Sequence, residues 1–123
     1  MNTAKRYSKQ RFTILHELKQ LTSHPTADEM YEIVKKTIPN ISLGTVYRNL
    51  NSLYADGEIL KFVYNGRDHF DANITPHIHL CCQNCGCICD VLEHFDSFEN
   101  ALKSTEFYNI NNIIINGVCQ NCR

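Results

Sequence analysis

Two Cys-x-x-Cys pairs, Cys82/Cys85 and Cys119/Cys122, constrain the fold of this chain more than any other feature. Zinc in structural sites takes four ligands in a tetrahedron, and four thiolates satisfy it. Each pair spans a tight turn that can direct both sulfurs to one point. The 33 residues between the pairs exceed the gap of a compact zinc ribbon, so a small folded unit should lie there. We predict a structural zinc site on these four cysteines. A redox-active Cys-x-x-Cys and unrelated buried thiols are the alternatives.

The 123 residues give room for one domain or two small ones. No apolar run approaches membrane-spanning length, and the N-terminal MNTAKRYSKQR lacks the apolar segment of a secretory signal. We therefore expect a cytoplasmic protein. In that compartment seven cysteines indicate metal binding or reactive thiols rather than disulfides. Four of them are assigned to zinc, which leaves Cys81, Cys87 and Cys89 without a role.

The net charge of −1 conceals a strong asymmetry along the chain. Residues 1–70 hold 10 Lys/Arg and 7 Asp/Glu, a net +3, whereas residues 71–123 hold 2 and 6, a net −4. The first 16 residues carry four cations and no acid. A basic first half and an acidic second half indicate that the first half approaches a polyanion such as nucleic acid.

The first half is predicted to form three short helices followed by a hairpin. The helices are expected from Ser8 to about Thr22, from Thr26 to about Thr37 and from Ser42 to Asp56. Thr26 and Glu29 form a capping box, and Asn65-Gly66 is a strong hairpin turn between residues 58–64 and 67–71. The apolar stripes expected to face the core are Phe12, Leu15, Leu18 and Leu21 on the first helix and Leu43, Val46, Leu50 and Leu53 on the third.

This order of elements predicts a winged helix-turn-helix. The third helix would be its recognition helix, because its other faces carry side chains that can bind base edges or phosphates in the major groove. These candidate DNA-binding residues are Thr45, Tyr47, Arg48, Asn49 and Asn51. An ordinary polar helix face is the alternative.

The second half is predicted to contain strands at 77–82, 87–92 and 107–116 and a helix at 96–104. About fifty residues are too few to rely on their own core, so zinc and self-association are the natural stabilisers. We expect an α+β protein in which residues 1–71 form a winged-helix DNA-binding domain, residues 72–76 a hinge, and residues 77–123 a small α/β dimerisation and metal-binding domain.

A second group of metal-binding side chains lies around the expected hinge. His77-x-His79 places two imidazoles on one face of a strand. Asp71 ends the hairpin, Asp90 lies on the neighbouring strand, and His24 precedes the second helix. Imidazole and carboxylate together suit a first-row divalent ion such as Fe²⁺ or Mn²⁺ better than thiolates do. Polar surface residues near a hinge are the alternative.

The motifs in this order resemble the ferric-uptake-regulator (Fur) superfamily of bacterial metal-dependent repressors. The resemblance covers nearly the whole chain and is carried by HPTADEMY (24–31), SLGTVYRNL (42–50), HFD (69–71), PHIHLCCQNCG (76–86) and GVCQNC (117–122). Asp71 favours the peroxide-sensing branch, because iron-uptake regulators usually carry Glu at that position.

The resemblance implies a regulatory Fe²⁺ or Mn²⁺ ion held by His24, Asp71, His77, His79 and Asp90, beside a structural Zn²⁺ on Cys82, Cys85, Cys119 and Cys122. It further implies a homodimer on palindromic double-stranded operator DNA that responds to hydrogen peroxide by Fe²⁺-catalysed oxidation of His24 or His77. Such a protein is a sensor and not an enzyme, and it has no small-molecule substrate. An iron- or zinc-uptake repressor responding to metal supply, and a redox enzyme using Cys-x-x-Cys, are the alternatives.

Overall fold

The computed structural model describes residues 2–107, 110 and 112–123. The chain divides into two compact units, Met1–Ile74 and Thr75–Arg123. The division falls within residues 72–76, the segment expected to be a hinge; bending at that segment stays a prediction. The first unit contains α1 (Asn2–Lys19), α2 (Ala27–Val34), α3 (Leu43–Ala55), β1 (Leu60–Tyr64) and β2 (Arg67–Asp71). The second contains β3 (His77–Cys82), β4 (Ile88–Val91), α4 (Phe95–Leu102), a short 3-10 turn (Lys103–Thr105) and β5 (Asn112–Gly117).

The starts of α2 and α3 follow the predicted local chemistry. At α2 the Thr26 hydroxyl accepts a hydrogen bond from the Glu29 amide at 3.3 Å, and the Thr26 amide donates to the Glu29 carboxylate at 2.9 Å. This is the expected capping box, which satisfies two amides that no helical carbonyl reaches. At α3 the Ser42 hydroxyl accepts from the Thr45 amide at 3.1 Å. The predicted starts of both helices are confirmed.

The first helix differs from its prediction at both ends. It begins at Asn2 and ends at Lys19, so Ser8 lies inside the helix rather than before its first turn. The cause is that residues 2–19 contain neither Pro nor Gly, and no local signal stops the helix from extending toward the N-terminus. Its buried face agrees with the prediction at Leu18, which is buried, and at Leu15 and Leu21, which pack against the core. Phe12, in contrast, is 69% exposed, and Ile14 is buried in its place.

The core of the first unit lies where the three helices meet the hairpin. It is built from Ile14, Leu18, Ala27, Met30, Val34, Ile41, Val46, Leu50, Leu53, Ile59 and Phe70. On α3 the buried stripe starts at Val46, and Leu43 in the first turn is 41% exposed, contrary to prediction. Three helices and a two-stranded hairpin in this order reproduce the element order expected of a winged helix-turn-helix.

The hairpin has the turn that its sequence predicts. β1 and β2 pair antiparallel from Leu60↔Asp71 to Tyr64↔Arg67. The two turn residues have positive φ angles, 57° at Asn65 and 76° at Gly66, as a type I′ turn requires. The register fixes Asp71 at the end of β2, beside the start of β1.

The second unit is a three-stranded sheet in the order β4-β3-β5. β3 pairs antiparallel with β4 and parallel with β5, and α4 lies in the crossover between β4 and β5. Side chains alternate along β3, so His77, His79 and Cys81 share one face. The expected helix at 96–104 begins one residue earlier and ends at Leu102. β5 covers the second part of the strand expected at 107–116; residues 108, 109 and 111 of that prediction lie outside the described residues.

Candidate metal centres

Three of the four predicted zinc cysteines of the second unit gather with one further thiol. Cys82 ends β3, Cys85 and Cys87 follow in the loop to β4, and Cys119 follows β5. The sulfur atoms of these four cysteines all lie within 4.8 Å of one another. A Zn–S bond of about 2.3 Å in a tetrahedron separates neighbouring sulfurs by about 3.8 Å. The Cys85 and Cys119 sulfurs are 3.8 Å apart, so the spacing fits structural zinc.

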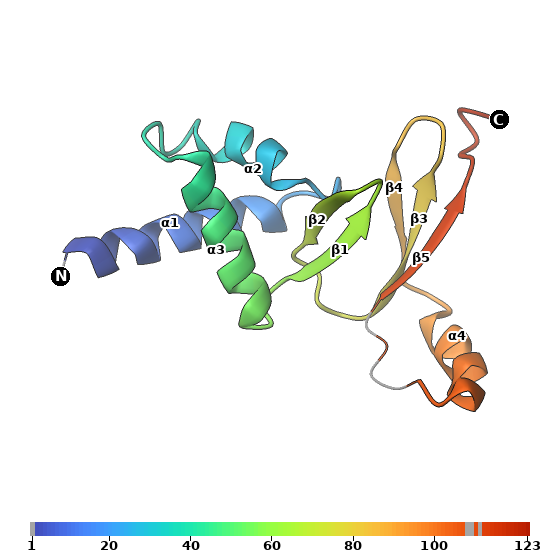
Figure 1. Ribbon diagram of the computed structural model, residues 1–123. Helices are drawn as coiled ribbons and strands as arrows, with labels where there is room; N and C mark the ends of the chain where they lie inside the picture. Colours follow the sequence, from blue (N-terminus) through green and yellow to red (C-terminus); the bar gives the residue numbers. More distant parts are fainter. Residues whose placement is uncertain (1, 108–109, 111) are drawn as a thin grey trace. The chain divides into compact units, whose positions relative to one another are not determined.

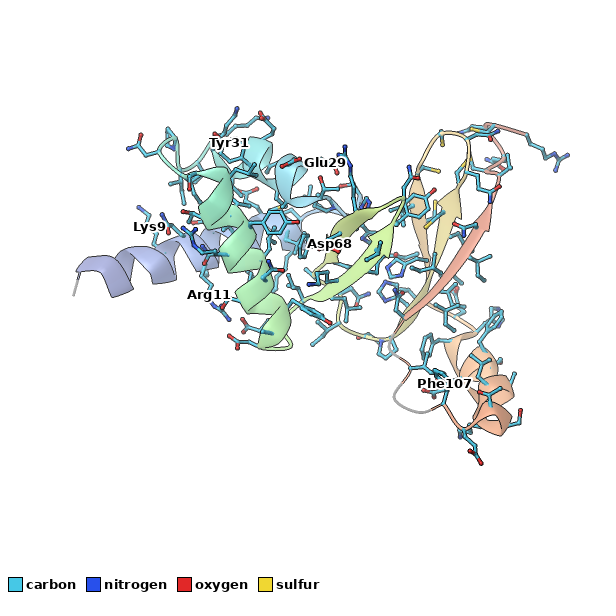
Figure 2. The ribbon with its side chains drawn as sticks, in the orientation of Figure 1. Lys9, Arg11, Glu29, Tyr31, Asp68 and Phe107 are labelled. Atoms are coloured by element: carbon cyan, nitrogen blue, oxygen red, sulfur yellow. The ribbon has the colours of Figure 1, made fainter. Side chains whose placement is uncertain are left out.

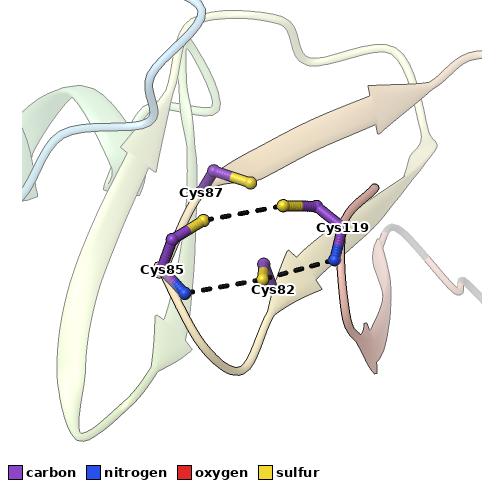
Figure 3. Close-up of side chains that lie close together, drawn as sticks. All are labelled: Cys82, Cys85, Cys87 and Cys119. Atoms are coloured by element: carbon purple, nitrogen blue, oxygen red, sulfur yellow. Dashed lines mark hydrogen bonds between the residues drawn. The ribbon is translucent and has the colours of Figure 1, made fainter. Parts of the chain in front are cut away.

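Backbone amides prepare Cys82 to act as a thiolate ligand. The amide of Cys85 donates to the Cys82 sulfur at 3.5 Å, and the amide of Cys119 donates to it at 3.3 Å (Figure 3). These two hydrogen bonds lower the pKa of the Cys82 thiol to about 5, and the bond from the Cys85 amide has the larger effect. The thiolate is the form that binds metal, so this position is set for coordination at neutral pH.

The fourth predicted zinc ligand, Cys122, lies beside the cluster. Its amide donates to the Cys119 carbonyl at 3.0 Å, which closes the Cys-x-x-Cys turn. The assignment of zinc to Cys82, Cys85, Cys119 and Cys122 stays a prediction. Cys87 occupies a position in the sulfur group that the spacing of the Cys-x-x-Cys pairs gave no reason to expect.

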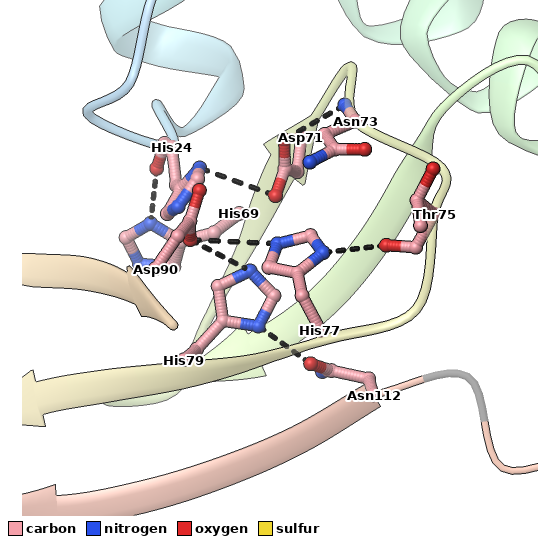
Figure 4. Close-up of polar contacts among 9 residues, drawn as sticks. All are labelled: His24, His69, Asp71, Asn73, Thr75, His77, His79, Asp90 and Asn112. Carbon is pink, nitrogen blue, oxygen red and sulfur yellow. Dashed lines mark hydrogen bonds and ion pairs between the residues drawn. The ribbon is translucent and has the colours of Figure 1, made fainter. Parts of the chain in front are cut away.

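Two buried imidazoles of the second unit present their Nε2 atoms to one carboxylate. His77 and His79 are both fully buried. The His77 Nδ1 contacts the Thr75 carbonyl at 2.6 Å, and the His79 Nδ1 contacts the Asn112 side-chain oxygen at 2.5 Å (Figure 4). Because both oxygens can only accept, each Nδ1 carries the hydrogen, and in the neutral ring the lone pair is on Nε2.

Asp90 on β4 faces both of these Nε2 atoms, since β4 pairs His79 with Asp90. Its Oδ1 atom lies 3.4 Å from the His77 Nε2 and 3.5 Å from the His79 Nε2. These separations exceed those of a good hydrogen bond. Metal–ligand bonds of about 2.1 Å place neighbouring ligands about 3.0 Å apart in an octahedron and about 3.4 Å apart in a tetrahedron. The three donors therefore fit a first-row divalent ion.

The first unit holds a smaller group of metal-binding side chains, one imidazole and one carboxylate. His24 and Asp71 are 2% and 4% exposed, and the His24 Nδ1 lies 3.5 Å from the Asp71 Oδ2. His24 has a φ of 53°, a left-handed conformation that costs a residue with a Cβ some strain. The His69 Nδ1 holds this backbone by a 2.7 Å contact with the His24 carbonyl. The Asn73 amide donates to the other Asp71 oxygen at 2.9 Å.

Three supporting groups were missed by sequence reasoning: His69, Asn112 and the Thr75 carbonyl. His69 lies inside the HFD motif, one residue before the buried Phe70, and could have been noticed there. Asn112 becomes visible only from the parallel register that sets β5 beside His77. Groups of this kind orient the imidazoles and decide which nitrogen faces the metal.

The predicted DNA-binding residues of α3 differ in their exposure to solvent. Tyr47 is 42% exposed and Arg48 is exposed, with its guanidinium donating to the Thr45 hydroxyl at 3.1 Å. Asn51 is half-buried. Asn49 is fully buried and donates to the Thr45 carbonyl at 2.9 Å. Asn49 therefore faces the core at this point of the helix, and the prediction that it contacts a base is wrong.

Two other basic residues of the first unit, Arg11 and Arg67, differ in their contacts. Arg11 on α1 donates to Ser52, Asp56 and Glu58 at 2.7, 2.7 and 2.9 Å, so it joins α1 to the end of α3 (Figure 2). Arg67, in contrast, is exposed at the hairpin turn. It borders a cavity of about 410 Å³ together with Tyr47 and residues at the start of α2. Sequence reasoning did not single out Arg67.

Comparison with known proteins identifies the class to which this fold and these donor groups belong. The sequence model of the "Ferric uptake regulator family" matches residues 2–116. The peroxide operon regulator of Bacillus subtilis is 33% identical over 126 residues, covering 98% of this chain and 86% of the relative. The peroxide-responsive repressor PerR of Staphylococcus epidermidis is 33% identical over 122 residues, covering 96% and 81%. The crystal structure of the Campylobacter jejuni peroxide stress regulator superposes with a TM-score of 0.83 at 31% identity, covering 98% of this chain and 94% of that one.

A unit of three helices and a hairpin, followed by a sheet unit with thiol and imidazole donors, defines a metal-binding transcriptional regulator. The chain belongs to the ferric uptake regulator family. It is accordingly a regulator and not an enzyme. The thiol cluster has the donors and spacing of a structural zinc site, and the imidazole and carboxylate groups suit a first-row divalent ion such as iron or manganese. Within the described residues no helix is both long enough and apolar enough to span a membrane.

Proposed function

We propose that this chain is a metal-dependent repressor that senses hydrogen peroxide by oxidation of His24 or His77 and releases its operator in response. The observation that carries the proposal is the pair of incomplete donor groups. His77, His79 and Asp90 supply three donors in the second unit, and His24 and Asp71 supply two in the first. The relatives named above as peroxide regulators support the same reading.

Neither donor group alone completes a coordination shell. First-row divalent ions such as Fe²⁺ and Mn²⁺ take up to six nitrogen or oxygen donors, so three or two donors leave positions unfilled. We infer that one regulatory ion takes donors from both units across residues 72–76. Such an ion favours the relative orientation of the units in which all five donors reach it, and that preference is its allosteric effect.

The first unit is the proposed DNA-binding domain and the second the proposed dimerisation domain. Thr45, Tyr47, Arg48 and Asn51 on α3 would enter the major groove, and Arg67 at the hairpin turn would contact phosphate. The second unit exposes Leu80, Ile115 and Val118, which are 39%, 37% and 51% exposed and suit a contact with a second copy. A two-fold dimer matches a palindromic operator whose half-sites lie about one helical turn apart.

Peroxide sensitivity is proposed to reside in the imidazoles. Fe²⁺ held by these residues would supply the electron that cleaves hydrogen peroxide into hydroxide and a strong oxidant. The rings of His24 and His77 lie in dry surroundings, 2% and 0% exposed, so they meet that oxidant before solvent does. A ring that has gained oxygen loses the basic nitrogen that its ligand role needs. Loss of one donor frees the two units from their fixed orientation, and operator affinity falls.

The test is mass spectrometry of zinc-loaded protein after treatment with hydrogen peroxide. With Fe²⁺, we expect a gain of one oxygen on the peptide carrying His24 or His77, together with loss of operator binding. With Mn²⁺, we expect neither. His16 and His94 are exposed and lie outside both donor groups, so their peptides are controls within the same molecule. Oxidation confined to cysteines, or equal oxidation of all histidines, would contradict the proposal.

The same experiment separates the alternative of an iron- or zinc-uptake repressor. Such a protein would bind its operator in response to metal supply and would keep that binding after peroxide treatment at constant metal. An operator-binding titration with Fe²⁺, Mn²⁺ and Zn²⁺, each with and without peroxide, therefore distinguishes the two repressors.

A further inference from the structure

Five cysteines of the second unit approach the zinc site, although tetrahedral zinc binds four thiolates. The Cys87 sulfur lies within 4.8 Å of the sulfurs of Cys82, Cys85 and Cys119, and the Cys122 amide donates to the Cys119 carbonyl at 3.0 Å. Both candidates for the fourth position therefore lie close to Cys119. The group of sulfurs that lie within 4.8 Å of one another contains Cys87 rather than Cys122.

The backbone around Cys87 fixes this placement. The Cys87 carbonyl accepts a hydrogen bond from the Cys82 amide at 2.9 Å, and the Gly86 amide donates to the Cys82 carbonyl at 3.0 Å. Gly86 has a φ of 79°, which only glycine adopts without strain, and it turns the chain so that Cys87 follows directly into β4. The Cys87 side chain is thus directed to the cluster by the loop that also positions Cys82 and Cys85 (Figure 3).

We propose that Cys87 is a competent fourth thiolate ligand, which exchanges with Cys122 on the same zinc ion. Zinc has no preferred geometry from its d electrons, so exchanging one thiolate for another changes neither the charge nor the ligand type of the site. The thiol that is not bound stays beside the metal as a spare donor. This assignment is independent of the proposed peroxide response, because it concerns zinc retention and not operator release.

The test compares Cys122→Ser, Cys87→Ser and the double substitution in the full chain, by zinc content and by the absorption of the Co²⁺-substituted protein. Each single variant should retain about one zinc per chain and a four-thiolate Co²⁺ spectrum. The double variant should lose zinc or show a three-thiolate spectrum. Cys89→Ser is the matched control, because Cys89 is an exposed cysteine two residues further along that lies outside the sulfur group.

Loss of zinc from Cys122→Ser, whether the variant folds or not, would overturn the proposal, and so would a three-thiolate spectrum in that variant. A second measurement uses alkylation with N-ethylmaleimide. In zinc-loaded Cys122→Ser, Cys87 should resist alkylation until a chelator is added, whereas Cys89 should react at once. A Cys87 that reacts as fast as Cys89 in the presence of zinc would equally overturn the assignment.

Discussion

Replacing Asn112 with Leu tests whether the hydrogen bond to His79 prepares the regulatory metal site. The Asn112 side-chain oxygen lies 2.5 Å from the His79 Nδ1, and His79 is fully buried. Leu has a similar size but no acceptor, so the buried N–H loses its partner. An unsatisfied buried donor costs about 1–3 kcal/mol, and the ring will turn or change tautomer to avoid that cost. Either response moves the Nε2 lone pair away from Asp90.

The expected loss of Mn²⁺ affinity follows from the effect of similar hydrogen-bond partners in other metal-binding proteins. Removing the partner of a metal-binding histidine lowers metal affinity by about 10- to 100-fold. This corresponds to about 1.4–2.7 kcal/mol of binding free energy. Asn112→Asp keeps an oxygen acceptor at the same place, so it should bind Mn²⁺ at least as tightly as the original chain. Asn116→Leu, on the same face of β5 but beside Cys81, is the matched control.

The assay is titration of the zinc-loaded chain with Mn²⁺, followed by the electron paramagnetic resonance signal of the free ion. Circular dichroism and zinc content show that each variant is folded. The reasoning would be refuted if Asn112→Leu bound Mn²⁺ like the original chain, or if Asn112→Asp were as weak as Asn112→Leu. If His77→Ala and Asp90→Ala also bound normally, the regulatory site itself would be misplaced, which is a different failure.

Three further predictions concern the first unit. Thr26→Ala removes the capping box and should lower the free energy of unfolding by about 1 kcal/mol, measured by urea denaturation, with exposed Thr22→Ala near zero. Leu50→Ala opens a cavity at a fully buried position and should cost about 2–5 kcal/mol, whereas Leu43→Ala, 41% exposed, should cost far less; equal costs would contradict the assigned helix phase. Arg67→Ala should weaken operator binding for all sequences alike and reduce the slope of log affinity against log salt by about 1, measured by fluorescence anisotropy.

The parts of the fold that could be predicted depend on short-range chemistry. The Thr26 capping box, the Ser42 cap and the Asn65-Gly66 turn each involve residues within four positions of one another, and all three have the expected form. The face of a helix that is buried, in contrast, is not decided by residues close in sequence. Phe12 and Leu43 fit an apolar stripe, yet both are exposed, because burial depends on which face meets a neighbouring element. Asn49 shows the reverse error, a polar residue placed on the surface that lies in the core.

The metal sites, too, could be predicted only in part from the sequence. His77 and His79 could be recognised because alternation along one strand puts them on one face. Residue type and position also suggested His24, Asp71 and Asp90, and the family resemblance implied that all five bind one ion. Cys87 and Asn112 could not be found in either way. Cys87 reaches the thiol cluster through the pairing of the Cys82 amide with its carbonyl, and Asn112 reaches His79 through a parallel register between strands separated by α4. Residues that only the register brings together carry no periodic signal in the chain, so the groups that tune a site are the last that a sequence reveals.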